Sequence, residues 1–329
     1  MVIFSAVPSV TMSVIWASAL LAAYVFLEWT FTRVPFLPVA TVGTAVAFYV
    51  GFKNNSAYDR FWEGRKIWGG IVNASRSFGN GALAYVYEDA DHAQRILVYR
   101  HLAWLNALRI QLRKKSRYHE WRDKRRNRYR WIELVEKKLR QDFGEEVGTF
   151  LSDEERAEVE SGANPATQIL RLQGQHLREL ADSGELDMFR QLELMAIVQE
   201  LYALQGKCER IKNTPFPRQY AYYARIFTWA FVTLVPCGLL DVFGEHISLE
   251  ALQQGDVMAA ISMVLSSALV SWVFLTMEVV GDYSEDPFEG SFTDVPMNAL
   301  SRTIEIDLRQ MLGEEEVPES EKPLGNILY

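Results

Sequence analysis

The chain has 329 residues and a formal net charge of −8, which argues against a general nucleic-acid binder, because phosphate binding needs a net basic surface or a basic face. Apolar residues make up 49% of the chain, and they gather in two blocks near its ends, while most of the charge lies between them. This segregation favours a membrane protein with a charged aqueous portion over two soluble domains.

The first apolar block contains two stretches. Residues 7–27 are long enough to cross a hydrocarbon core of about 30 Å. We expect this stretch to be retained rather than cleaved as a secretory signal, because no basic segment precedes it and residues 39–52, also apolar, follow soon after. The connection, residues 28–38, holds two charges and two prolines, as a short exposed turn does. The sequence therefore predicts a transmembrane hairpin over residues 1–52.

The second apolar block also contains two stretches, residues 226–240 and 257–277, which predict a second hairpin over residues 226–281. Pro236 predicts a kink or an early end in the first of them. Basic residues then set the orientation, because all but four of the chain's 34 Lys and Arg lie in residues 53–225. By the positive-inside tendency this region is cytoplasmic, and residues 282–329 and both termini are cytoplasmic with it.

The region between the hairpins has the periodicity of helices. We expect helices over about residues 92–115, 130–141, 168–182 and 185–212, and one that starts at Ser152 with a capping signature. No strand pattern or phosphate-binding loop occurs, so the fold class is an all-α membrane protein: four transmembrane helices and a cytosolic helical bundle.

The second predicted span has two distinct faces. Gly43, Ala47 and Gly51 recur every four residues and form a small-residue stripe on which a neighbouring helix could pack. Beside it lies a second stripe that consists of Thr44, Phe48 and Phe52. This arrangement makes the span a candidate for a pore-lining helix, although periodicity alone favours an ordinary transmembrane helix packed on its partners.

After Phe52 the same helix continues with closely spaced charges, amides and rings. The residues expected to support its packing are Asn54, Asn55, Asp59, Arg60 and Glu63. Such a density of opposite charges indicates a partly buried network that fixes the helix against its neighbours. A sharper alternative is that Lys53 and the two asparagines meet permeating ions.

The other polar clusters in the sequence give weaker indications of a binding site. The carboxylates Asp282, Glu285, Asp286 and Asp294 are weak calcium candidates, but their spacing is not that of an EF-hand. Residues 113–130 are strongly basic and indicate a solvated helix, or else a contact with anionic lipid headgroups. The histidines have no ligand spacing and the two cysteines lie in unlike segments, so no metal, cofactor or enzymatic activity is expected.

Four segments, taken in order, resemble the bacterial branch of the bestrophin family of ion channels. They are GFKNNSAYDRFWEGRKIWG with the downstream ASRSF, then CERIKNTPFP, EDPFEGSFTDVP and IEIDLRQM. The resemblance covers nearly the whole chain and implies a homopentamer around a central pore in the bacterial inner membrane. It also implies that Thr44, Phe48 and Phe52 form an apolar neck, and that Ile211 forms a second, cytosolic aperture.

Two departures from the family pattern concern the neck and calcium. Thr44 is polar where an aliphatic residue is common, which implies a wetter outer ring. The run of consecutive acidic residues found in calcium-gated animal members is interrupted here by residues 290–293, which argues against calcium gating.

The resemblance implies a passive channel for small ions, either chloride and other anions or monovalent cations, whose partners are itself, lipid and the permeating ions. Apolar rings carry no charge preference, so the sequence leaves selectivity open. The alternative from another class is a membrane-anchored helical signalling or scaffold protein without a pore, although a mere anchor does not need the mixed small and aromatic face of the second span.

Overall fold

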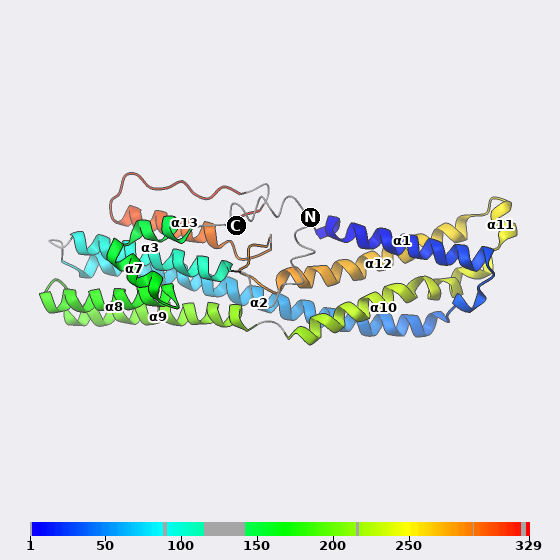
Figure 1. Cartoon of the computed structure of the whole chain (residues 1–329), viewed down its shortest axis with the longest axis horizontal. Helices are drawn as coiled ribbons and strands as arrows, with labels where there is room; N and C mark the ends of the chain where they lie inside the picture. The colour runs from blue at the N-terminus through cyan, green and yellow to red at the C-terminus, as the bar shows by residue number, and fades with distance from the viewer. Residues whose placement is uncertain (1, 88–90, 115–141, 215–216, 292, 324–326) are drawn as a thin grey trace. The chain divides into compact units, whose positions relative to one another are not determined.

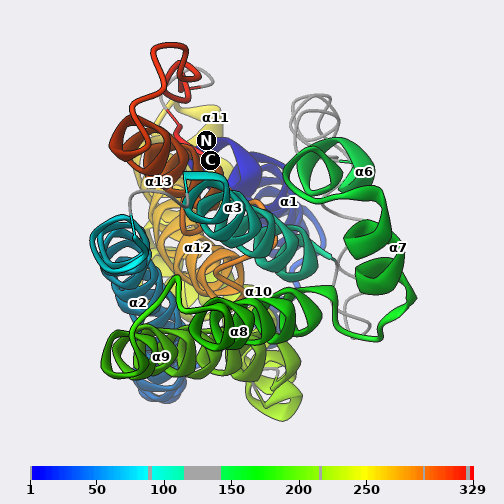
Figure 2. The same cartoon turned by 90° about the vertical axis from the view of Figure 1, so that its left-hand side faces the viewer.

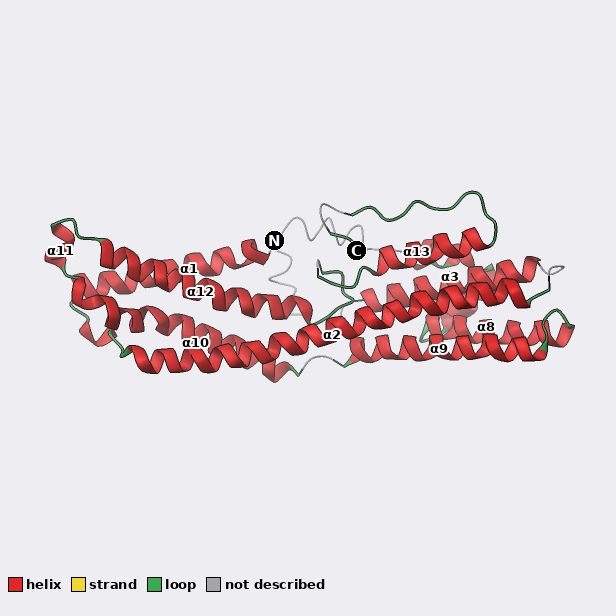
Figure 3. Ribbon diagram, turned by 180° about the vertical axis from the view of Figure 1, so that it is seen from behind, coloured by secondary structure: helices red, strands yellow, loops and turns green. Residues whose placement is uncertain are grey.

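The computed structural model describes residues 2–87, 91–114, 142–214, 217–291, 293–323 and 327–329. In these ranges the regular elements are helices, and strand-like pairing is limited to isolated bridge residues, namely Val86 with Leu186 and, near the C-terminus, Ile327 (Figure 3). The all-α fold class is confirmed. The helix expected at residues 130–141 and nearly all of the basic segment at 113–130 lie outside the described residues.

The helices divide into two compact units, which are residues Met1–Asp59 with Phe216–Glu285, and residues Arg60–Pro215 with Asp286–Tyr329. We call the first the membrane unit and the second the aqueous unit. One helix, α2 (Phe36–Tyr85), belongs to both. The apolar second span and the polar stretch after it are therefore one uninterrupted helix.

The membrane unit is built from α1 (Val2–Phe26), the first part of α2, α10 (Arg218–Phe243) and α12 (Met258–Ser284), which lie side by side in Figure 1. Four described helices are long and apolar enough to cross a membrane, and each coincides, to within a residue or two at its ends, with one of the four predicted spans or contains it. Short elements join them at one end: η1 (Thr30–Thr32), η4 (Gly244–His246) and α11 (Leu249–Gln253).

Pro236 does not end the third span. It lies inside α10, which continues to Phe243, so the expectation of an early end is wrong. A proline removes one intrahelical donor and need not break a membrane helix whose freed backbone groups find other partners. Here the indole Nε1 of Trp16 on α1 donates to the carbonyl of Thr233, 3.1 Å away, and ties the two helices together beside the proline.

The aqueous unit contains the rest of α2 and seven described helices, which are α3 (Asp91–Arg113), α6 (Phe143–Glu146), η3 (Gly148–Phe150), α7 (Asp153–Ser161), α8 (Pro165–Ser183), α9 (Met188–Asn213) and α13 (Met297–Met311). Figure 2 views these helices end-on. The predicted capping box is present at α7, where the Ser152 hydroxyl accepts from the backbone N–H of Glu155 and the Glu155 carboxylate accepts from that of Ser152.

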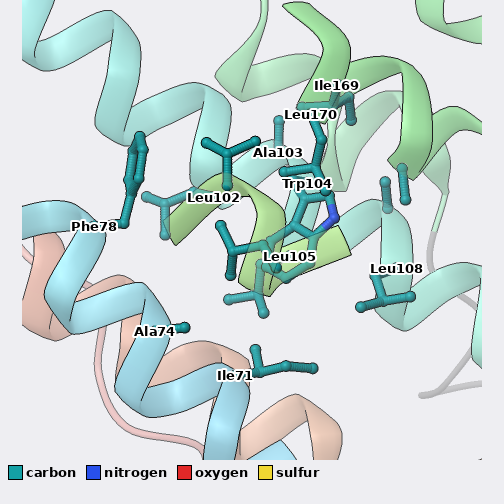
Figure 4. Packing of buried hydrophobic residues seen from close by; sticks show 14 of the residues in the cluster. Ile71, Ala74, Phe78, Leu102, Ala103, Trp104, Leu105, Leu108, Ile169 and Leu170 are labelled. Carbon is teal, nitrogen blue, oxygen red and sulfur yellow. The ribbon is translucent and has the colours of Figure 1, made fainter. Parts of the chain in front are cut away.

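The core of the aqueous unit is centred on α3, which contacts α8, α9 and α13. Trp104 and Phe78 are among its largest fully buried side chains, as Figure 4 shows. His101 lies between them, with ring centroids 5.1 Å from Phe78 and 5.2 Å from Trp104. Burial lowers the pKa of His101 to about 3, so this imidazole is neutral and serves as a packing group.

Candidate pore-lining helix and its polar brace

The three residues of the small-residue stripe of α2 differ in how closely other helices of the same chain pack against them. A Cβ built on Gly43 would lie 2.6 Å from Cε2 of Phe231 on α10, so only glycine fits beneath that ring. Ala47 is half-buried, whereas a Cβ on Gly51 would meet no described atom within 4 Å. Close packing inside the chain therefore occurs at Gly43 and does not extend to Gly51.

The second stripe of α2 points away from the chain's own core. Thr44 is exposed, and the side chains of Phe48 and Phe52 are 67% and 72% exposed. Val46 and Val50, by contrast, are buried in a cluster with residues of α10. Two uncovered phenyl rings on a membrane helix need an apolar neighbour outside this chain, whether lipid, another subunit or a narrow lumen.

The hydroxyl of Thr44 is already engaged with its own helix. Its Oγ1 donates to the carbonyl of Ala40, 3.0 Å away. The hydroxyl donor is therefore used within the helix and is not available to water or ions outside it. The Thr44 side chain is less polar toward its surroundings than the sequence alone suggests.

Immediately after Phe52, four charged side chains from three helices form a closed cluster that we call the brace. Lys53 on α2 is 2% exposed, and its Nζ lies 2.5 Å from Oδ1 of Asp282 and 3.9 Å from Oε1 of Glu278, both on α12. Arg225 on α10 pairs with the same two carboxylates, at 3.1 Å to Glu278 and 2.7 Å to Asp282. Two cations and two carboxylates thus join α2, α10 and α12.

The helices of the brace approach closely beside it. Asn54 donates from Nδ2 to the carbonyl of Met277, 2.9 Å away. A Cβ built on Gly281 would lie only 2.1 Å from Oδ1 of the same asparagine. Glycine is therefore required at position 281 for α2 to reach the backbone of α12.

The sequence also allowed Lys53, Asn54 and Asn55 to meet permeating ions. In the single chain, only Asn55 is exposed enough to do so. Lys53 is buried among carboxylates and Asn54 bonds a backbone carbonyl. Asn55 is exposed, and its Nδ2 lies 3.5 Å from Oδ2 of Asp59, which is also exposed.

The remaining polar residues of α2 bind the C-terminal end of α9 within the aqueous unit. Arg60 donates to the carbonyls of Ile211 and Thr214, each 2.9 Å away. These carbonyls lack helical partners, so the guanidinium completes the end of α9. One turn further along α2, Glu63 pairs with Arg210.

Ile211 itself is 4% exposed and belongs to the core of the aqueous unit. The predicted aperture role is therefore not visible in one chain. A different part of α9 leaves apolar side chains uncovered, since Met188, Phe189 and Leu192 at its N-terminal end are 62%, 73% and 60% exposed.

The weak calcium candidates already have other partners. Asp282 belongs to the brace, and Oδ2 of Asp294 accepts the backbone N–H groups of Gly290 and Ser291, at 2.6 and 2.9 Å. Glu285 is buried, and like Asp286 it has interactions within the chain. In the part of the chain that the structure describes, no three His, Cys, Asp or Glu side chains come together as metal ligands.

Sequence reasoning missed the partners of Lys53. Its prediction of a buried network on α2 did not include Arg225 or Glu278, which lie about 170 residues or more further along the chain. A signal was available, because Glu278 and Asp282 stand one helical turn apart at the end of an apolar span, where carboxylates are costly unless paired.

Comparisons with known proteins agree with this architecture. The family described as "Bacterial/Fungal Bestrophin protein" matches residues 1–310. A voltage-dependent anion channel-forming protein of Mesorhizobium japonicum is 27% identical over 84% of this chain and 75% of its own length. The protein of that description from Escherichia coli, YneE, is 27% identical over 90% of this chain and 82% of its own. Among solved structures, a bacterial bestrophin homolog from Klebsiella pneumoniae superposes with a TM-score of 0.77, at 24% identity, over 96% of this chain and 100% of that one, which shows a shared fold.

Proposed function

The chain belongs to the bacterial and fungal bestrophin family, and from this premise we propose that it forms a passive anion channel with the second span of each subunit lining the pore. Bestrophins are channels rather than enzymes. The choice of anions rests on the two bacterial relatives that are named voltage-dependent anion channel-forming proteins. The single observation that carries the pore assignment is the outward-facing stripe of α2, on which Phe48 and Phe52 are uncovered by their own chain.

The proposed assembly is a homopentamer in which five copies of α2 surround the axis. In that arrangement Phe48 and Phe52 form apolar rings at which water is excluded, and ions cross when the rings widen or water enters. Thr44 forms the outer ring, and Gly51, which has no close neighbour among the described atoms of its own chain, faces an adjacent subunit. The brace, together with Asn54, keeps the phenyl stripe in register.

The proposed location is the bacterial inner membrane, with both termini cytoplasmic. The end of the membrane unit that carries η1, η4 and α11 supports this orientation, because Arg33 is the one Lys or Arg in its connections and is paired with Asp241 and Glu245. We place the segment boundaries at residues 1–52, 53–225, 226–281 and 282–329. The compact units change over within about seven residues of the first and last of these three boundaries, and about ten residues before the second.

A single preparation of purified protein tests this function. We expect a protein mass in detergent of about five 37.7-kDa chains, and a reversal potential in asymmetric NaCl that follows the chloride gradient. A monomer or dimer without conductance would favour the alternative of a membrane anchor. A pentamer whose reversal potential follows sodium would retain the channel and overturn the anion assignment.

A second constriction in the aqueous unit is proposed at Ile211, as the family resemblance implies. The exposed Phe189 is the alternative position for this constriction. Because Ile211 is buried, Ile211→Ala is expected to lower the free energy of unfolding by about 2–5 kcal/mol. Ile211→Val preserves most of the packing, so this variant is the one whose single-channel conductance is measured. If it leaves single-channel conductance unchanged while Phe189→Ala alters it, the aperture lies at the start of α9 instead.

A further inference from the structure

A polar cavity of about 230 Å³ lies in the aqueous unit, and its lining residues come from elements other than α2. Its walls come from α3, from α6 with η3, from α13 and from the segment after α13. Asn106 and Arg109 on α3 face Asn298, Ser301 and Glu305 on α13, and each of these five residues is at most 9% exposed. Buried polar side chains are rare unless they are hydrogen-bonded, so their gathering around one space calls for a partner.

Two residues of the cavity lining each carry a buried donor that has no hydrogen-bond partner among the described residues. One is Nε of Arg109, although NH2 of the same guanidinium bonds Asn106 and Glu146, each 2.8 Å away. The other is the hydroxyl of Ser301, a residue that is 4% exposed. A buried donor without a partner costs about 1–3 kcal/mol, which an acceptor oxygen entering the cavity would recover.

The charges around these donors favour an anionic group at the inner end of the cavity. Burial lowers the pKa of Arg109, and the nearby guanidinium of Arg302 lowers it further, while Glu146 raises it. A carboxylate next to the guanidiniums of Arg109 and Arg302 would offset both the desolvation of Arg109 and their mutual repulsion.

The rest of the lining excludes a simple anion. Four glutamates line the cavity, namely Glu145, Glu146, Glu305 and Glu321, against the two arginines Arg109 and Arg302. This excess of carboxylates repels phosphate, sulfate and dicarboxylates, but it suits a ligand that also carries a positive charge. The volume is below the roughly 300–1,000 Å³ of pockets for drug-sized ligands, which indicates a small metabolite.

We propose that this cavity binds a small zwitterion of the amino-acid class, whose carboxylate accepts hydrogen bonds from Arg109 and Ser301 and whose ammonium group faces the glutamates. Such recognition places each ligand charge beside an opposite one and satisfies both unpartnered donors. The site lies in the aqueous unit, and ligand binding there can be measured on the purified protein without recording a current.

The test is thermal unfolding of the full-length protein in detergent, with L-amino acids, acetate, methylamine and inorganic phosphate as separate probes at about 10 mM. At least one amino acid is expected to raise the Tm saturably by about 2 °C or more, while acetate and methylamine are not. If no amino acid raises the Tm, or if phosphate raises it as much, the proposed ligand class is wrong.

Two variants locate the binding. Ser301→Ala removes one donor and is expected to weaken the affinity for the active amino acid about tenfold. Ser75→Ala is the matched control, since Ser75 is also buried in the aqueous unit but lies outside the cavity wall, and its hydroxyl bonds the carbonyl of Ile71. Equal affinities for the two variants would show that the amino acid binds elsewhere, and would overturn the proposal.

Discussion

The double substitution Phe48→Ala and Phe52→Ala is expected to raise the open probability of the channel about tenfold, which corresponds to about 1.4 kcal/mol in the closed–open equilibrium. Both rings are largely uncovered by their own chain, so the fold does not depend on them. In a pentamer the substitution removes every phenyl group from the proposed neck, and water then fills a constriction that had excluded it. Planar bilayer recordings of single channels measure the change.

The matched control is Phe31→Ala in η1. Phe31 is 76% exposed and belongs to the same membrane unit, but it lies outside α2. It should leave both conductance and open probability unchanged. If the double variant behaves as this control does, α2 does not line the conduction path through its phenyl stripe.

Lys53→Met is expected to prevent stable folding, or to lower the free energy of unfolding by about 3–5 kcal/mol. The substitution removes one of the two cations that pair with Glu278 and Asp282 in the brace, so the cluster gains an uncompensated negative charge in a buried place. Yield, the Tm in detergent and size-exclusion profiles measure the effect.

Two further variants separate loss of the brace from loss of a lysine. Lys66→Met removes a lysine from an exposed position of the same helix and should be nearly neutral. Combining Lys53→Met with Glu278→Gln restores the balance of charge and should recover part of the loss, as in a double-mutant cycle. A Lys53→Met protein as stable as Lys66→Met would contradict the structural role of the brace.

The sequence predicted those features that depend on local periodicity. Four spans and the long helices of the aqueous unit follow from apolar runs and from a repeat of 3.6 residues. The stripe of Phe48 and Phe52 followed in the same way, because residues four apart must share a face of one helix. The capping box at Ser152 also needed only neighbouring residues.

Features that join distant segments could not be predicted in this way. The partners of Lys53 come from two other helices, and nothing in α2 specifies which carboxylates will face it. Gly51 continues the spacing of Gly43, yet only Gly43 lies beneath a ring of α10. Whether Ile211 would be covered depended on α9 packing against the rest of the aqueous unit, and the local pattern at a helix end does not contain that information.

The arrangement of charges in the brace limits how this part of the channel can act on an ion. Lys53 and Arg225 alternate with two carboxylates, so the four groups together form a quadrupole without net charge. The field of a quadrupole falls off much more steeply with distance than that of a single charge. An approaching chloride ion therefore experiences almost no long-range attraction from these two cations, and because the cluster is largely buried, bath salt screens it little. In the proposed pore, Lys53 therefore serves to fix α2 against α12 and does not attract passing ions from a distance.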